Sequence, residues 1–433
     1  MSRRRRPATA FPVSVPAVAA ALLAASVLCI GPAAAASAAV VPAATAPGDL
    51  AGVDYVALGD SYSAGYGLVP YSFTTPADGC FQAEANYPHQ VAATLGLDLT
   101  DVTCSGAVTA NIIDTPQVTI TGAGTAAPQS TALSADTDLV TVSIGGNDLG
   151  FADVAAYCVA LSADGPVIGN PAFKNCREYF NPSEGVDQLV YKLQNTVEPA
   201  LAAAFADIRS KAPNAEVVVV GYPTIAPDVE NVPEGGCFTP AVTDEPPYPE
   251  NAFPFTDVDT EYLHGVEAKL DHAIGSAAST AGFHYVSTLP LTESNSACQT
   301  DGSAYVNGVT LLLATPEHPH PGGTPTPDPF LFVKYGALHP NAAGVASLAE
   351  QVTATVEDVL AADPTDPDPT PTPTATPAPT ATATPEPTAT STPAPALAAT
   401  GATPAPLLAG LAALLAAVAG ASALALTLRR RPH

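Results

Sequence analysis

Basic residues are scarce in this chain of 433 residues, which has 14 Lys and Arg against 41 Asp and Glu and a formal charge of −27. Seven of the 14 lie at positions 3–6 and 429–431, and no acidic residue occurs in 1–38 or 401–433. The chain between these ends therefore carries 41 acidic and 7 basic residues, a charge of −34. Binding to nucleic acid or to anionic lipid needs clustered Lys and Arg. The composition thus excludes a nucleic-acid partner.

The first 38 residues have the pattern of a secretory signal peptide. Arginines at 3–6 precede an apolar run over 11–30 and the small residues 33–38, which offer A-x-A cleavage sites. The arginine run is also compatible with a twin-Arg export signal. We therefore predict that residues 1–38 direct export and are then removed.

The C-terminus has the pattern of a surface anchor. Residues 407–428 form an uncharged run of 22 residues, long enough to cross a bilayer core of roughly 30 Å, and the arginines after it favour a cytoplasmic end. Residues 397–401 read LAATG, so residues 397–433 resemble a sortase sorting signal of the LAxTG type. The resemblance implies a sortase that cuts between Thr400 and Gly401 and links Thr400 to peptidoglycan. The alternative is a retained single-pass membrane helix.

Between these ends, composition separates a linker from a folded body. Residues 363–396 consist mainly of Pro, Thr and Ala and hold 11 of the 46 prolines, which predicts a disordered linker. Residues 49–362 form one predicted domain, in which apolar runs of strand length alternate with segments of helical spacing. The expected strands are residues 55–58, 139–144, 217–220 and 284–286, and the expected helices span residues 186–208, 263–274 and 345–360. This alternation predicts an α/β domain with a mainly parallel sheet.

Six cysteines remain after removal of the signal peptide: Cys80, Cys104, Cys158, Cys176, Cys237 and Cys298. An even number in an exported chain indicates disulfides, but six cysteines allow 15 pairings, and their spacing does not select one. The sequence has no C-x-x-C pair, which argues against a zinc site and a redox dithiol. His318 and His320 are flanked by prolines and lack further ligands nearby, so we predict no metal.

The first expected strand leads directly into residues 59–65, GDSYSAG. A Ser between a strand end and a glycine-bearing turn projects its hydroxyl at the carboxyl edge of the sheet, where open α/β folds bind their ligands. Ser61 taken alone is equally suited to a helix cap or a turn. The G-x-S-x-G elbow is absent, because Ser63 stands where its second glycine belongs.

Three further segments give Ser61 a context. Gly106 follows Cys104 and Ser105, residues 145–148 read GGND after the second strand, and residues 339–341 read HPN before the last helix. Together the four segments resemble the GDSL-like esterases and lipases, the SGNH hydrolases, over residues 55 to about 360. The resemblance implies a three-layer α/β/α fold with a mainly parallel sheet.

The same resemblance assigns roles to the residues that match. Ser61 matches the nucleophile and His339 its general base, a pairing that makes chemical sense because a Ser hydroxyl needs a base and His is neutral near pH 7. The Ser61 N–H, the Gly106 N–H and the Asn147 side-chain amide match the oxyanion hole. The family places an Asp three residues before the His, where this chain has Gly336. We therefore expect the Gly336 carbonyl to orient His339, with the Asp328 carboxylate as the alternative.

The resemblance also implies disulfides in sequence order, Cys80–Cys104, Cys158–Cys176 and Cys237–Cys298. We predict a secreted, surface-displayed and monomeric serine esterase or lipase that acts on carboxylic esters without a cofactor. The long insertions at residues 69–85 and 232–255 are expected to form the walls of its acyl groove. One alternative is a carbohydrate O-acetylesterase on the same fold. A non-catalytic surface adhesin is another, against which the intact Ser61, Gly106, Asn147 and His339 argue.

Overall fold

The computed structural model describes residues 50–361, apart from residues 73–78, 123, 184, 245 and 315–329. The predicted signal peptide, linker and sorting signal fall outside these residues, as do Asp328, Thr400 and Gly401. Among the helices of the described part, none is long and apolar enough to span a membrane. The span predicted at residues 407–428 is not among them and stays a prediction.

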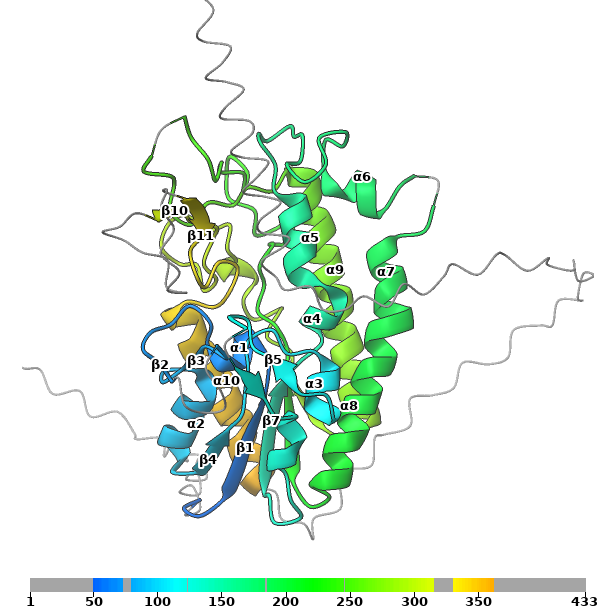
Figure 1. Cartoon of the computed structure of the whole chain (residues 1–433), viewed down its shortest axis with the longest axis vertical. Coiled ribbons are helices and arrows are strands. Elements are labelled where there is room, and N and C mark those ends of the chain that lie inside the picture. Colours follow the sequence, from blue (N-terminus) through cyan, green and yellow to red (C-terminus); the bar gives the residue numbers. More distant parts are fainter. Residues whose placement is uncertain are drawn as a thin grey trace, which may run out of the picture. The chain divides into compact units, whose positions relative to one another are not determined.

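A parallel sheet of five strands, in the order β4-β1-β7-β8-β9, forms the centre of the domain (Figure 1). Its strands are β1 (Asp54–Gly59), β4 (Asp98–Asp101), β7 (Leu139–Ser143), β8 (Glu216–Val220) and β9 (His284–Val286). β1 pairs with β7 from Tyr55 opposite Leu139 to Gly59 opposite Ser143. The three central strands are apolar and buried along almost their whole length, as expected for strands covered on both faces.

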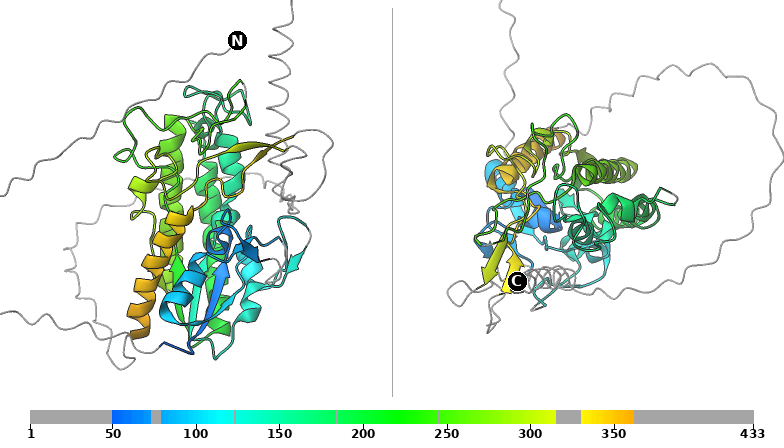
Figure 2. Two further views of the ribbon diagram at one scale, coloured as in Figure 1. Left: turned by 90° about the vertical axis from the view of Figure 1, so that its left-hand side faces the viewer. Right: turned by 90° about the horizontal axis from the view of Figure 1, so that it is seen from above.

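Helices cover both faces of this sheet and give the domain three layers. The covering helices are α2 (Tyr87–Leu95), α3 (Thr109–Ile113), α8 (Glu198–Lys211), α9 (Asp257–Thr280) and α10 (Ala342–Ala361). α2 and α10 contact each other and share a core cluster with Val218 and Val220, whereas α3, α8 and α9 share another with Val217 and Val219. Figure 2 shows α10 running along its side of the sheet. The alternating side chains of β8 thus enter two separate cores, which confirms the predicted three-layer architecture.

The other elements are short. The helices are α1 (Ser61–Ala64), α4 (Gly146–Leu149), α5 (Phe151–Cys158), α6 (Cys176–Phe180), α7 (Gln188–Lys192), a π-helical turn (Leu193–Val197) and two 3-10 turns (Gln129–Ala132 and Glu293–Asn295). Three antiparallel pairs join β2 (Tyr71–Ser72) to β3 (Gln82–Ala83), β5 (Gln117–Val118) to β6 (Thr125–Ala126), and β10 (Leu311–Ala314) to β11 (Phe330–Val333).

All four predicted strands and all three predicted helices are present. The helix expected over residues 186–208 is made of α7, the π-helical turn and α8 in succession. Val186 does not belong to it, since it is 65% exposed and precedes Asp187, whose carboxylate caps α7. The edge strand β4 escaped prediction because its sequence, DLTD, has two acidic residues and no apolar run.

Three disulfides fix the loops around this core. They join Cys80 to Cys104, Cys158 to Cys176 and Cys237 to Cys298, with S–S distances of 2.07, 1.89 and 2.01 Å. These are the pairs that the family resemblance implies. Each closes a loop of 18 to 61 residues and thereby restricts the unfolded chain.

Candidate active site

Three neighbouring strands end at one edge of the sheet, and each leads into a turn with polar side chains. β1 leads into Asp60 and Ser61, β7 into residues 145–148, and β8 into Gly221 and Tyr222. β7 lies between β1 and β8. Because open α/β sheets bind ligands outside the carboxyl ends of their strands, this edge is the candidate active site.

Ser61 is the first residue of α1 and follows β1 without a loop. The Asp60 carboxylate caps the helix, since its Oδ1 accepts a hydrogen bond from the Tyr62 N–H at 3.0 Å. Gly59 permits the sharp turn: its φ is +136°, and a Cβ at this position would lie 2.6 Å from the carbonyl oxygen of Ser143. The turn thus holds the Ser61 side chain at the sheet edge.

His339 lies on the turn between β11 and α10, 278 residues after Ser61 in the sequence. Its Nε2 is 2.8 Å from Ser61 Oγ. The preceding residue, Leu338, has a φ of +58°, and its carbonyl accepts a hydrogen bond from the Tyr62 hydroxyl at 2.6 Å. The Tyr62 ring also lies 4.7 Å from the imidazole, centre to centre. The residue next to Ser61 therefore holds the turn that carries His339.

The Ala337 carbonyl, and not that of Gly336, faces the second nitrogen of His339. The distance from Nδ1 to the Ala337 oxygen is 2.8 Å. The Gly336 carbonyl instead accepts hydrogen bonds from the His339 N–H and from Asn307 Nδ2, both at 3.1 Å. The predicted orienting residue was therefore wrong, although a backbone carbonyl is what the structure uses. The alternative, Asp328, lies outside the described residues.

The Ala337 carbonyl determines the tautomer of His339. A carbonyl oxygen only accepts hydrogen bonds, so Nδ1 must carry the proton when the two atoms bond. Nε2 of the neutral imidazole is then unprotonated and accepts the hydrogen bond of the Ser61 hydroxyl. This is the arrangement that a general base needs to take the proton of a Ser.

The residues of the predicted oxyanion hole lie on two adjoining loops. Gly106 has a φ of +85°, a conformation that side chains disfavour. The Asn147 Nδ2, on α4, donates a hydrogen bond to the carbonyl of Ala107 at 2.9 Å, which ties the two loops together. Within the described chain, no acceptor bonds to the backbone N–H of Ser61 or of Gly106. Both donors are thus available to a substrate oxygen.

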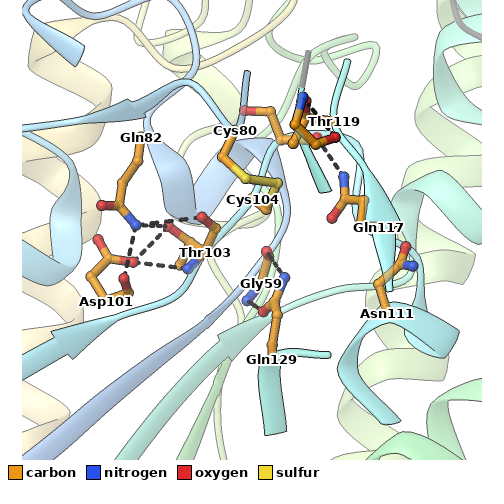
Figure 3. Close-up of a disulfide and its surroundings, with 12 residues drawn as sticks. Gly59, Cys80, Gln82, Asp101, Thr103, Cys104, Asn111, Gln117, Thr119 and Gln129 are labelled. Carbon is orange, nitrogen blue, oxygen red and sulfur yellow. Dashed lines mark hydrogen bonds between the residues drawn. A yellow bond between two sulfur atoms is a disulfide. The ribbon is translucent and has the colours of Figure 1, made fainter. Parts of the chain in front are cut away.

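A network around the Cys80–Cys104 disulfide holds the Gly106 loop (Figure 3). The Ser105 N–H donates to the Cys80 carbonyl at 2.9 Å, and Gln117 Nε2 donates to the Ser105 carbonyl at 2.8 Å. Figure 3 also shows Gln129, which bonds to both the N–H and the carbonyl of Gly59 at 2.7 and 2.9 Å. Hydrogen bonds from Gln117 and Gln129 therefore hold the two loops that carry Gly106 and Ser61.

Two groups at this edge have shifted pKa values. Burial lowers the pKa of His339 from 6.5 to about 4, although part of the residue remains accessible to solvent. The imidazole is then neutral at pH 7 and able to act as a base. Burial raises the pKa of Asp60 to about 7, against hydrogen bonds from Tyr222 and Tyr62 that favour its ionised form.

Other candidates have structural roles. Asp148 accepts hydrogen bonds from the Thr109 N–H at 3.0 Å and from the Thr109 hydroxyl at 2.6 Å, and so joins α4 to α3. The described residues contain no group of three or more His, Cys, Asp or Glu able to hold a metal ion. His318 and His320 are not among the described residues.

Sequence reasoning missed Tyr62, Tyr222 and Ala337. Tyr62 belongs to the GDSYSAG segment, but no role is predicted for its side chain. Ala337 acts through its backbone carbonyl, and the residue type does not indicate such a role. Tyr222 follows β8 directly and bonds to Asp60. Its place after a predicted strand was the one signal that pointed to the site.

A Ser–His pair at the carboxyl edge of a three-layer α/β/α domain defines a hydrolase of the serine type. The sequence matches the GDSL-like Lipase/Acylhydrolase family over residues 57–346. The chain belongs to this family and is an ester hydrolase of the lipase and esterase kind.

Relatives of known name agree with this placement. The chain is 32% identical to Lipase 2 of Streptomyces coelicolor over 315 residues, which cover 72% of the chain and 87% of the relative. It is 31% identical to an esterase of Streptomyces scabiei over 354 residues, 78% of the chain and 95% of the relative. Among solved structures, it is 25% identical to phospholipase A1 of Streptomyces albidoflavus, over 71% of this chain and 100% of that one, with a TM-score of 0.47.

The pKa values of His339 and Asp60 predict the pH profile of activity. His339 must be neutral to accept the Ser61 proton, so its protonation should lower kcat/KM for an uncharged ester with a midpoint near pH 4 and not near 6.5. The wild-type profile should have a second inflection near pH 7, from Asp60. Asp60→Asn should remove that inflection and leave the one of His339.

The measurement is kcat/KM from about pH 3.5 to 9 for both proteins. Samples held at each pH and returned to neutrality control for acid unfolding. If kcat/KM of Asp60→Asn falls at low pH with a midpoint at or above pH 6.5, this would contradict the lowered pKa of His339.

Proposed function

We propose that the chain is a serine esterase that hydrolyses carboxylic esters through an acyl-enzyme on Ser61. The observation that carries the proposal is the 2.8 Å contact between Ser61 Oγ and the unprotonated Nε2 of His339. Ser61 Oγ attacks the ester carbonyl carbon while its proton passes to Nε2, and His339 then gives this proton to the departing alcohol. Water repeats the sequence on the acyl-enzyme and releases the carboxylic acid.

The oxyanion of each tetrahedral intermediate would be bound by Ser61 N–H, Gly106 N–H and Asn147 Nδ2. The two unbonded backbone N–H groups support this role, and Asn147 keeps a second amide hydrogen besides the one it gives to Ala107. Fixed donors of this kind contribute roughly 10² to 10³ in rate each.

Ser61→Ala tests the proposal directly. The variant should lose hydrolysis of p-nitrophenyl esters by roughly 10⁴-fold or more, because no other group replaces the attacking oxygen. Ser63→Ala is the matched control, since Ser63 is buried in the same helix and its hydroxyl bonds, among the described residues, only to the Tyr87 hydroxyl, at 3.2 Å. Full activity in Ser61→Ala would reject Ser61 as the nucleophile, whereas no turnover of any ester by the wild type would reject the esterase and favour the adhesin.

A small apolar cavity is the candidate site for an acyl group of short chain. It has a volume of about 20 Å³, and its lining includes Leu338, the residue before His339. Its walls are Phe151, Ala155, Ile225, Ala226, Phe253, Phe255, Leu263, Glu267 and Leu338. Glu267 accepts hydrogen bonds from the Ile225 and Ala226 N–H groups, and burial raises its pKa to about 8, so it is uncharged at neutral pH. Phe253 and Phe255 both belong to the insertion at residues 232–255 that is predicted to form a wall.

Phe255→Leu tests whether this cavity receives the acyl chain. The larger space should move the optimum of kcat/KM among p-nitrophenyl esters from acetyl to palmitoyl towards longer chains, by about fourfold per methylene newly accommodated. Phe283→Leu is the control, because Phe283 is buried against Phe205 in the same core but does not line the cavity. Identical profiles in the two variants would place the acyl chain elsewhere, and activity confined to acetyl esters would support the O-acetylesterase.

We further propose that the enzyme is exported and attached to the cell wall. The pattern of residues 1–38, the LAATG segment at 397–401 and the three disulfides support this placement. A linker rich in proline would extend by about 3.1 Å per residue and hold the domain away from the wall.

Thr400→Ala separates wall attachment from a membrane helix. In a Gram-positive host with a matching sortase, lysozyme should release the wild-type enzyme from the wall fraction, while the variant should stay with the membrane. Thr403→Ala, three residues further on, should behave as the wild type. Equal distribution of all three proteins would favour the retained single-pass anchor.

A further inference from the structure

Tyr222 lies at the same edge of the sheet but takes no part in the reaction proposed above. It stands two residues after the end of β8. Its hydroxyl lies 2.6 Å from Asp60 Oδ2, on the turn that presents Ser61, and 3.0 Å from the backbone nitrogen of Gly146, on the turn that presents Asn147. One side chain from β8 thus joins the turns that follow β1 and β7.

The directions of these hydrogen bonds are fixed. The Gly146 N–H can only donate, so the Tyr222 oxygen accepts it and the Tyr222 hydroxyl proton goes to the Asp60 carboxylate. The second oxygen of Asp60 accepts the Tyr62 N–H at 3.0 Å. Asp60 is 1% exposed, so no bulk water replaces a lost partner. A chain of hydrogen bonds therefore runs from the Asn147 turn to the Ser61 helix.

The Tyr222 side chain is closely packed between the Gly146 turn and the Tyr62 ring. A Cβ on Gly146 would lie 3.2 Å from both Cζ and the hydroxyl of Tyr222, closer than ordinary van der Waals contact. The Tyr222 ring meets the Tyr62 ring edge to face at 4.9 Å, and the Tyr62 ring lies over His339. The glycine of the GGND segment is thus matched to a tyrosine 76 residues further along the chain.

We propose that Tyr222 is a positioning residue that sets the distance between the Ser61 and Asn147 donors of the oxyanion hole. The inference rests on the proposed function of these donors. Without the hydroxyl, the Gly146 N–H and the Asp60 carboxylate each lose a partner, and the two turns are free to separate. A shift of this kind weakens binding of the oxyanion and leaves binding of the ground-state ester almost unchanged, because only the transition state develops the charge.

Tyr222→Phe keeps the ring and removes the hydroxyl. We expect kcat for a short-chain p-nitrophenyl ester to fall by about 10- to 100-fold, less than the loss of a whole donor, with KM within about twofold. Inhibition by a trifluoromethyl ketone, which forms an oxyanion when Ser61 adds to it, should weaken by the same factor as kcat/KM.

Tyr285→Phe is the matched control. Tyr285 also donates to a carboxylate, Asp271 Oδ1, at 2.6 Å, and it contacts none of Ser61, Gly146 and His339 among the described residues. A general cost of removing a tyrosine hydroxyl would appear in both variants, as a lowered Tm. Only Tyr222→Phe should change kcat and the affinity for the ketone.

A double-mutant cycle with Asp60→Asn provides the second test. If the Tyr222 hydroxyl acts through Asp60, the double variant should lose about as much kcat as the more impaired single variant. Multiplicative losses, a normal kcat in Tyr222→Phe, or a KM that rises as much as kcat falls would each overturn the proposal. Wild-type hydrolysis that Ser61→Ala abolishes, measured in the same assay, separates these outcomes from failure of the proposed function.

Discussion

The hydrogen bond between Ser61 Oγ and His339 Nε2 is the interaction on which the site depends, and its partners are 278 residues apart in sequence. Such a contact survives only if both ends are fixed by the fold. Ser61 is fixed by the register of β1 against β7 and by the turn at Gly59. His339 is fixed from the other side, because Asn341 accepts the Ala343 and Gly344 N–H groups at the start of α10 and donates to the Ala304 carbonyl. α10 in turn packs on the sheet face that α2 also covers.

No described carboxylate contacts His339, and this shapes its chemistry. A carbonyl such as that of Ala337 sets the tautomer but adds no charge to stabilise the imidazolium that the proposed acylation would form. The surrounding Tyr62 and Tyr66 rings keep the imidazole neutral and lower its pKa. The barrier must then be lowered mainly where negative charge develops, at the ester oxygen. This makes the placement of the oxyanion donors more important than the strength of the base.

Sequence reasoning predicted the parts of the site that depend on residue type and failed on those that depend on backbone position. Ser61, His339 and Asn147 are recognisable because their chemistry needs a hydroxyl, an imidazole and an amide. Ser61 and Asn147 also follow strands that an apolar run reveals, and His339 precedes a predicted helix. The carbonyl that orients His339 could not be predicted from residue type, because every residue has a carbonyl. Which carbonyl faces Nδ1 follows from the turn at Leu338, whose positive φ is not evident in a leucine. The strand β4 shows the same limit, since an edge strand needs no apolar run.

The glycines of the GDSYSAG and GGND motifs make room for other parts of the protein itself. Gly59 makes room for the Ser143 carbonyl, at the end of the neighbouring strand, and Gly146 makes room for Tyr222. A glycine in such a motif is easily interpreted as space for the substrate, yet here the nearest atoms belong to the chain. Three strand ends and the turns that follow them are thereby packed as one unit, with the Tyr222 hydroxyl bonded to two of the turns. Because two of the proposed oxyanion donors, Ser61 and Asn147, sit on these turns, the spacing of these two follows from the order β1-β7-β8 in the sheet as much as from the motifs themselves.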